Sequence, residues 1–117
     1  KPMKLTIGET VLTAALADNS SAKTLEEKLR DGPITIRMED YARMEKVGNL
    51  PFRLPTNDQS ITTQAGDLIF YLGNSFEIYY APNSWRFTLL GHIEGGTAQE
   101  LKKVLGRGDV TVTLSLD

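Results

Sequence analysis

The chain contains no cysteine in its 117 residues, and this absence removes several kinds of chemistry at once. Without cysteine there is no disulfide bond, no thiolate nucleophile and no cysteine-ligated metal. Histidine is almost absent as well, since His92 is the single one. A lone histidine without His or Cys partners makes a poor metal site. We therefore expect neither a metal nor a cofactor, and we interpret His92 as a structural or surface residue.

An excess of basic residues is also lacking, because 13 Lys and Arg stand against 15 Asp and Glu, a formal net charge of -2. Domains that bind nucleic acid usually carry a basic excess or a basic face, so we do not expect nucleic acid as a partner. No apolar run approaches the ~18 residues of a membrane-spanning helix, which argues against membrane insertion. No signal peptide is recognisable. This favours the cytoplasm, whereas a leader already removed would indicate the periplasm or secretion.

What is present is the composition of an ordinary globular domain, with 40% hydrophobic and 24% charged residues. A chain of this length is enough for one domain and not for two. We therefore predict a single domain over residues 1–117. We interpret residues 1–3 as an artificial extension or as the remnant of a removed leader.

Alternating apolar and polar residues predict extended strands in several parts of the chain. The predicted strands form hairpins at residues 4–17 and 68–80 and stand singly at 34–39, 87–94 and 110–116. Between them, residues 40–67 contain prolines, glycines and polar clusters, so we predict mostly loop there, with a short strand at 44–47. A loop of this length is uncommon in a small domain and is often functional.

Two segments carry the pattern of amphipathic helices. In residues 18–33, residues that favour the N-cap, beginning at Asn19, precede apolar residues at helical spacing, and glycine and proline end the pattern. In residues 97–105, Thr97 and Glu100 have the spacing of a capping box ahead of an apolar face. The two helices lie far apart in the chain, one early and one late.

Seven or eight short strands with two helices predict a mostly β fold. Each alternating strand needs one covered face. A closed β-barrel with the two helices capping its open ends covers those faces and removes the exposed sheet edges. A strand-rich α+β sandwich is the alternative topology.

Several stretches, taken together and in this order, resemble a family of small prokaryotic cyclophilin-like proteins. These stretches are LTIG, DNSSA, EKVGNLPFRLPT, AGDLIFYLGN and IYYAPNSWRFTLLGHI. The segment FTLLGHIEGGTAQELKKVLGRGDVTVTLS is also similar to the C-terminal third of cyclophilins, where a strand, a helix and a closing strand follow one another. The resemblance spans nearly the whole chain and implies a cyclophilin-like barrel.

The resemblance does not carry over an enzymatic activity. Peptidyl-prolyl isomerases of the cyclophilin family have a Phe-His-Arg stretch, which this chain lacks, before a Met-x-Gln-Gly-Gly-Asp stretch. The nearest counterpart to the second is TQAGD at residues 63–67, without the methionine and one glycine. His92 follows the Leu90-Gly91 pair, whereas the cyclophilin histidine precedes the corresponding pair. We therefore favour a non-enzymatic binding domain, with a peptidyl-prolyl isomerase of remodelled active site as the alternative and no catalytic residue assigned.

The predicted ligand groove lies between the 40–67 loop and an 81–86 loop, and its ligand is a small molecule or an extended peptide. Catalysis of prolyl isomerisation would need an apolar pocket and a fixed donor near the proline nitrogen, a role that suits arginine. The candidates for the groove are Arg43, Phe52, Arg53, Phe70, Asn83, Trp85 and Arg86. The competing interpretation makes these arginines solvated and lets Trp85 cap a barrel end.

We do not assign a functional role to the acidic residues near position 40 or to the tyrosines of the predicted strands. Glu39, Asp40 and Glu45 are neighbours without a second acidic cluster that would complete a glycosidase-like carboxyl pair. We interpret them as solvated charges. Tyr71, Tyr79 and Tyr80 lie on predicted strands, and we interpret them as mostly core residues with one hydroxyl at the rim, since a tyrosine combines a large apolar ring with a polar tip.

Overall fold

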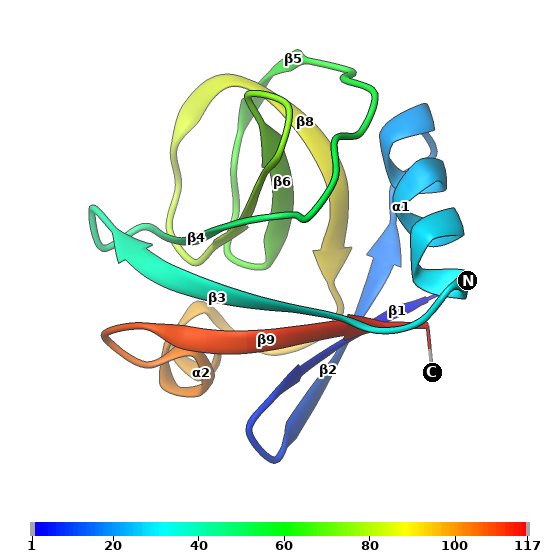
Figure 1. Ribbon diagram of the computed structural model, residues 1–117. Helices are drawn as coiled ribbons and strands as arrows, with labels where there is room; N and C mark the ends of the chain where they lie inside the picture. The colour runs from blue at the N-terminus through cyan, green and yellow to red at the C-terminus, as the bar shows by residue number, and fades with distance from the viewer. Residues whose placement is uncertain (1, 117) are drawn as a thin grey trace.

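The computed structural model describes residues 2–116, and within them eight strands close into a barrel (Figure 1). Every neighbouring pair is antiparallel, and the pairing of β2 with β8 closes the sheet. The barrel strands, in the order in which they neighbour one another, are β2 (Thr10–Leu16), β1 (Met3–Ile7), β9 (Val110–Ser115), β3 (Ile34–Tyr41), β4 (Glu45–Asn49), β7 (Ser75–Tyr79), β6 (Asp67–Tyr71) and β8 (Ser84–Ile93). The predicted mostly β barrel with two helices is confirmed.

The interior of the barrel holds the main hydrophobic core. Side chains alternate across each strand, so Leu68 and Phe70 of β6 point inward together with Phe76 and Ile78 of β7. Met3 is fully buried in the same cluster and pairs with Ala14, so it is part of the fold. The prediction for Lys1 falls outside the described residues.

The two helices cover the barrel with their apolar faces and lie at different sides of it in Figure 1. Helix α1 (Ser20–Arg30) is capped by Asn19, whose side chain accepts a hydrogen bond from the Ala22 backbone N–H. Helix α2 (Ala98–Leu105) begins with the predicted capping box. Leucines from both helices belong to the core cluster. Neither helix of residues 2–116 has the length and apolar character needed to cross a membrane.

In the segment 40–67 the predicted short strand at 44–47 is present as β4, and a second strand, β5 (Gln59–Thr62), was not predicted. β4 lies hydrogen-bonded between β3 and β7, and β5 pairs with the start of β8. β8 in turn begins at Ser84, so Trp85 and Arg86 lie in a strand and not in the predicted loop. These strands have weak local patterns, and they form because each finds a partner distant in sequence.

Closure of the barrel depends on a close backbone approach at Gly91. A Cβ atom at this position would lie 2.4 Å from the backbone oxygen of Ala15 on β2. Glycine inside a strand typically marks such an approach. Gly91 thus lets β8 come near enough to β2 for the pairing of Leu16 with Gly91.

An ion pair between the fully buried Lys46 and the partly buried Asp40 joins β3 and β4 to the loop before β9. Lys46 has 0% exposure, and its Nζ donates to the Gly108 carbonyl oxygen at 2.7 Å and lies 3.1 Å from Asp40 Oδ1. The Tyr80 hydroxyl also donates to Asp40. Burial raises the pKa of Asp40, but the hydrogen bonds from Tyr80 and Lys46 outweigh it, so the pKa lies below its usual value. The cation is therefore fully paired, as a buried charge requires.

Candidate functional site

A second hydrophobic cluster lies on the outer face of the barrel. Along β6 and β7 the side chains between the inward-pointing ones face the other side of the sheet. There Ile69, Tyr79 and Phe87 are buried against one another, and the Phe87 ring lies 5.5 Å from that of Tyr79 and 5.6 Å from that of Tyr71. β8 and the attached β5 extend this face. An apolar surface outside the barrel core is thereby built from strands that the closed barrel holds rigidly.

A cleft of about 310 Å³ opens beside this cluster, and we name it the acidic cleft. Its walls come from β3, β4, β6, β7 and β8, together with the loop before β8. The residues that line it are Tyr41, Glu45, Val47, Tyr71, Glu77, Tyr79, Asn83, Trp85 and Phe87. Five of these nine are aromatic, two are acidic and none is basic, so the cleft combines apolar walls with negative charge.

The two carboxyl groups lie next to each other on adjacent strands. In the register of β4 with β7, Glu45 is opposite Tyr79 and Val47 is opposite Glu77, which places the glutamates diagonally on one face. Both are buried, with 4% exposure for Glu45 and 5% for Glu77. Within residues 2–116, Glu77 Oε1 has no hydrogen-bond partner, although buried polar atoms nearly always have one. Glu77 therefore presents an unsatisfied acceptor at the cleft.

Burial and mutual repulsion change the protonation of this pair. Burial and the nearby charge of Glu45 together raise the pKa of Glu77 to about 8. Burial raises the pKa of Glu45 as well, although a hydrogen bond from Tyr79 acts in the opposite direction. Two adjacent buried carboxyls cannot both ionise easily. The pair consequently retains a proton at neutral pH.

Tyr79 and Asn83 order the polar side of the cleft. Burial raises the pKa of the Tyr79 hydroxyl, and the neighbouring carboxylates act in the same direction. The Asn83 side chain donates to this hydroxyl at 3.3 Å. Asn83 is itself fixed by Thr63, through its N–H to Thr63 Oγ1 at 2.9 Å and its carbonyl oxygen, which accepts from Thr63 N at 2.8 Å. The polar groups are thus held in place before any ligand arrives.

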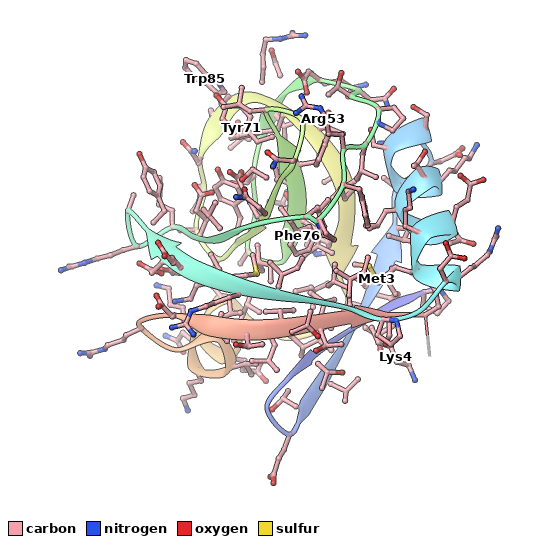
Figure 2. The ribbon with its side chains drawn as sticks, viewed as in Figure 1. Met3, Lys4, Arg53, Tyr71, Phe76 and Trp85 are labelled. Carbon is pink, nitrogen blue, oxygen red and sulfur yellow. The ribbon has the colours of Figure 1, made fainter. Side chains whose placement is uncertain are left out.

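Trp85 and Tyr41 form the exposed rim. Their exposures of 61% and 62% are high for large aromatic side chains. Figure 2 shows Trp85 at the outer edge of the molecule, near Tyr71. Trp85 also borders a second, shallow groove along the paired strands β5 and β8, with Ile61 directly opposite it in the register. Trp85 therefore stands between two depressions of the same surface.

The structure brings two of the predicted groove residues, Asn83 and Trp85, into the acidic cleft. Arg86 lies in the neighbouring shallow groove, where it donates to the Asp58 carbonyl oxygen at 3.2 Å. Phe70 is fully buried inside the barrel and faces away from the cleft.

The other three candidates lie elsewhere. Phe52 packs against the barrel core, with the Lys28 ammonium 5.5 Å from its ring centroid. Arg53 lies over Gly73, where a Cβ atom would be 2.2 Å from the guanidinium. Arg43 is exposed in the turn between β3 and β4 with a φ of 56°. None of the predicted arginines lines the acidic cleft.

The glutamates are the residues that sequence reasoning missed. Glu45 was expected to be a solvated charge, and its burial corrects that interpretation. Glu77 stands in SFEIYY, between the inward-facing Phe76 and Ile78 and two residues before Tyr79. A charged residue at the outward position of an otherwise apolar, aromatic strand is the signal that could have indicated a covered outer face.

The closed antiparallel barrel with two helices and a cleft on its outer face defines a cyclophilin-like β-barrel. The family model described as the cyclophilin-like family matches residues 5–115, and the chain belongs to this family. No curated protein sequence matches the chain.

Proposed function

We propose that this domain binds a small molecule or an extended peptide in the acidic cleft. The observation that carries the proposal is Glu77, a nearly fully buried carboxyl whose Oε1 has no partner within the described part of the chain. A buried acceptor without a partner costs about 1–3 kcal/mol. A ligand that donates a hydrogen bond would recover that free energy on binding. The free-energy cost of an unpartnered carboxyl oxygen at Glu77 therefore supports a binding role for the cleft.

The lining of the cleft also suits a ligand. Small-molecule sites are concave, mostly apolar and supplied with a few placed polar groups, and their volumes begin at roughly 300 Å³. The acidic cleft has this size, aromatic walls and polar groups oriented by Thr63 and Asn83. Exposed aromatic rings such as Trp85 and Tyr41 provide large contact areas at a small entropic cost.

An extended peptide has a further element to contact. β5 is the last strand of the sheet order, so its outer edge carries no strand among residues 2–116. Extended peptides add to such edges through main-chain hydrogen bonds, while alternate side chains enter pockets. Trp85, opposite Ile61 of β5, separates this edge from the acidic cleft.

The alternative is a peptidyl-prolyl isomerase with a remodelled site. That reaction stabilises a twisted amide, and a fixed donor beside the proline nitrogen is the group that does so. The acidic cleft has no basic lining residue, and Arg43, Arg53 and Arg86 lie outside it. The binding reading is favoured for this reason.

Two measurements test the proposal. Acetylated and amidated tetrapeptides with one variable residue would be added to the ¹⁵N-labelled domain, and amide shifts clustered at Glu45, Glu77 and Asn83 are expected. Shifts confined to the opposite end of β3, around Ile34, would contradict the location. Separately, cis–trans isomerisation of a proline tetrapeptide should stay at background with the wild-type protein. Turnover that Arg86→Ala or Arg53→Ala abolishes would establish the isomerase instead.

A further inference from the structure

The acidic cleft has an uncompensated charge of one sign. Glu45 on β4 and Glu77 on β7 face the cleft together with the tyrosines Tyr41, Tyr71 and Tyr79 of β3, β6 and β7. β8 contributes Trp85 and Phe87, and no lysine, arginine or histidine stands among the lining residues. Elsewhere in the fold a buried charge has its partner, as Lys46 has in Asp40. The cleft thus lacks the cation that would balance its carboxyls.

The unpartnered oxygen of Glu77 indicates what kind of group would balance the two carboxyls. Glu77 Oε1 is buried and unpartnered, while Oε2 has a long contact of 3.4 Å with Ser75 Oγ. Only a group with N–H or O–H donors can satisfy Oε1, and a positively charged donor forms the stronger bond to a carboxylate. Quaternary ammonium ions fail this requirement because they have no N–H group.

The aromatic side chains that line the acidic cleft also favour a positively charged ligand. A cation within about 6 Å of an aromatic face is attracted by the ring quadrupole, most strongly by tryptophan. Trp85, Tyr41 and Tyr71 line the cleft together with the two carboxyls. Hard metal ions, by contrast, prefer six or more oxygen ligands. The described residues contain no group of three or more His, Cys, Asp and Glu side chains that could hold a metal.

We infer that the acidic cleft takes an organic cation bearing N–H donors, a protonated primary amine or a guanidinium group, with its charge between Glu45 and Glu77. The apolar part of the ligand packs against Phe87, Tyr71 and Trp85. This inference rests on the proposed binding function and names its ligand class. The cation is either a free small molecule or the side chain of a lysine or arginine in an extended peptide.

Binding of the cation displaces a proton from the carboxyl pair. The pKa of Glu77, about 8 in the empty cleft, means that the pair holds a proton at pH 7. The positive charge of the ligand favours the doubly ionised pair, so that proton is released when the cation enters. Affinity for a permanently charged guanidinium should therefore rise up to about tenfold per pH unit from pH 6 to pH 8 and level off above it.

The experiment is isothermal titration calorimetry with butylguanidinium and butylammonium chlorides, compared with tetramethylammonium chloride, neutral butanol and magnesium chloride. The two sources are distinguished by titrating acetylated, amidated tetrapeptides that contain lysine, arginine, leucine or aspartate at one position. Variants Glu77→Gln and Glu45→Gln remove one carboxylate each with little change of shape. Glu39→Gln, on the exposed side of β3 and outside the cleft, is the matched control.

The butyl cations are expected to bind, and Glu77→Gln should weaken them about tenfold to a hundredfold, as hydrogen bonds to charged groups do when removed. Glu39→Gln should leave affinity unchanged. Trp85→Ala, a substitution at an exposed side chain that the fold does not need, should weaken binding about threefold through the lost cation–π contact. Circular dichroism verifies that each variant is folded.

Three outcomes would overturn the inference. If leucine or aspartate peptides or butanol bind in the cleft while the cations do not, the ligand class is wrong and the proposed function stands. If magnesium or tetramethylammonium binds as well as the N–H cations, the donor requirement is refuted. If none of these probes binds and no amide shift appears at Glu45 or Glu77, both the inference and the proposed function fail.

Discussion

Replacing Glu77 with glutamine should remove a pH dependence of stability from this domain. Glutamine keeps the shape of the side chain and cannot ionise. In the wild-type protein, burial beside Glu45 raises the pKa of Glu77 from its ordinary 4.5 to about 8. The native state therefore keeps a proton between these two pH values that the unfolded chain has already lost.

The sign of the effect follows from that difference in bound protons. Where the native state binds more protons than the unfolded state, the free energy of unfolding falls as pH rises. The contribution of Glu77 to the free energy of unfolding is fully present below about pH 4.5. It decreases between about pH 4.5 and pH 8 and is lost above about pH 8. At about 1.4 kcal/mol per pH unit the whole interval amounts to about 5 kcal/mol. Most of it, about 3–4 kcal/mol, should appear between pH 5 and pH 8.

Urea denaturation followed by circular dichroism, repeated from pH 5 to pH 9, measures this dependence. The wild-type free energy of unfolding should fall by that amount. Glu77→Gln should show a clearly shallower curve, with the remaining slope due to Glu45, whose pKa burial also raises, and should be the more stable protein at pH 8. Asp40, whose pKa is lowered, titrates in the acid range below this window and acts in both proteins alike. Glu39→Gln, an exposed control on β3, should retain the wild-type slope.

Two results would refute the reasoning. A wild-type stability that is constant or rises between pH 5 and pH 8 would show that Glu77 ionises normally in the fold. Equal slopes in the wild-type and the Glu77→Gln protein would assign the dependence to another group. Carbon-13 chemical shifts of the Glu77 carboxyl, followed through the same titration, report its ionisation directly.

Three further substitutions probe the scaffold of the site. Gly91→Ala places a methyl group 2.4 Å from the Ala15 carbonyl oxygen and should lower the free energy of unfolding by about 1–3 kcal/mol, measured by thermal denaturation. An unchanged stability would show that β8 and β2 do not approach closely at Gly91. Asn19→Ala removes the helix cap and should lose about 1–2 kcal/mol in urea denaturation, whereas Asn19→Asp, which keeps the capping oxygen, should lose less. Lys46→Ala leaves Asp40 without its buried cation and should destabilise by about 3–5 kcal/mol, while a loss below 1 kcal/mol would contradict a buried pair.

The elements that the sequence predicts correctly are those whose signals are local. The capping box of Thr97 and Glu100 and the cap of α1 at Asn19 involve residues within one helical turn. The alternation in β9 likewise reports a strand with one buried face, and Val112 and Leu114 point into the core as expected. The early and late helices, both hairpins and the closed barrel could be predicted for this reason.

The candidate site could be predicted only in part, because its residues meet through pairings between distant strands. Asn83 and Trp85 stood out as polar and aromatic residues beside a proline. The partner of Glu45 is Glu77, 32 positions later, and only the register of β4 with β7 places them on one face. The arginines looked like ligand contacts from their sequence neighbourhood, yet the fold places the turn residue Arg43, the loop residue Arg53 and the β8 residue Arg86 outside the acidic cleft.

Sequence alone therefore determined the helices, most of the strands, the barrel and the family of this protein, since short-range spacing and order along the chain encode them. Tertiary structure decided that β5 and the first residues of β8 are strands, that the outer face of β6 and β7 is covered, and that two glutamates are buried together. Burial and the distance between charges set the pKa of Glu77, and both depend on which strands become neighbours.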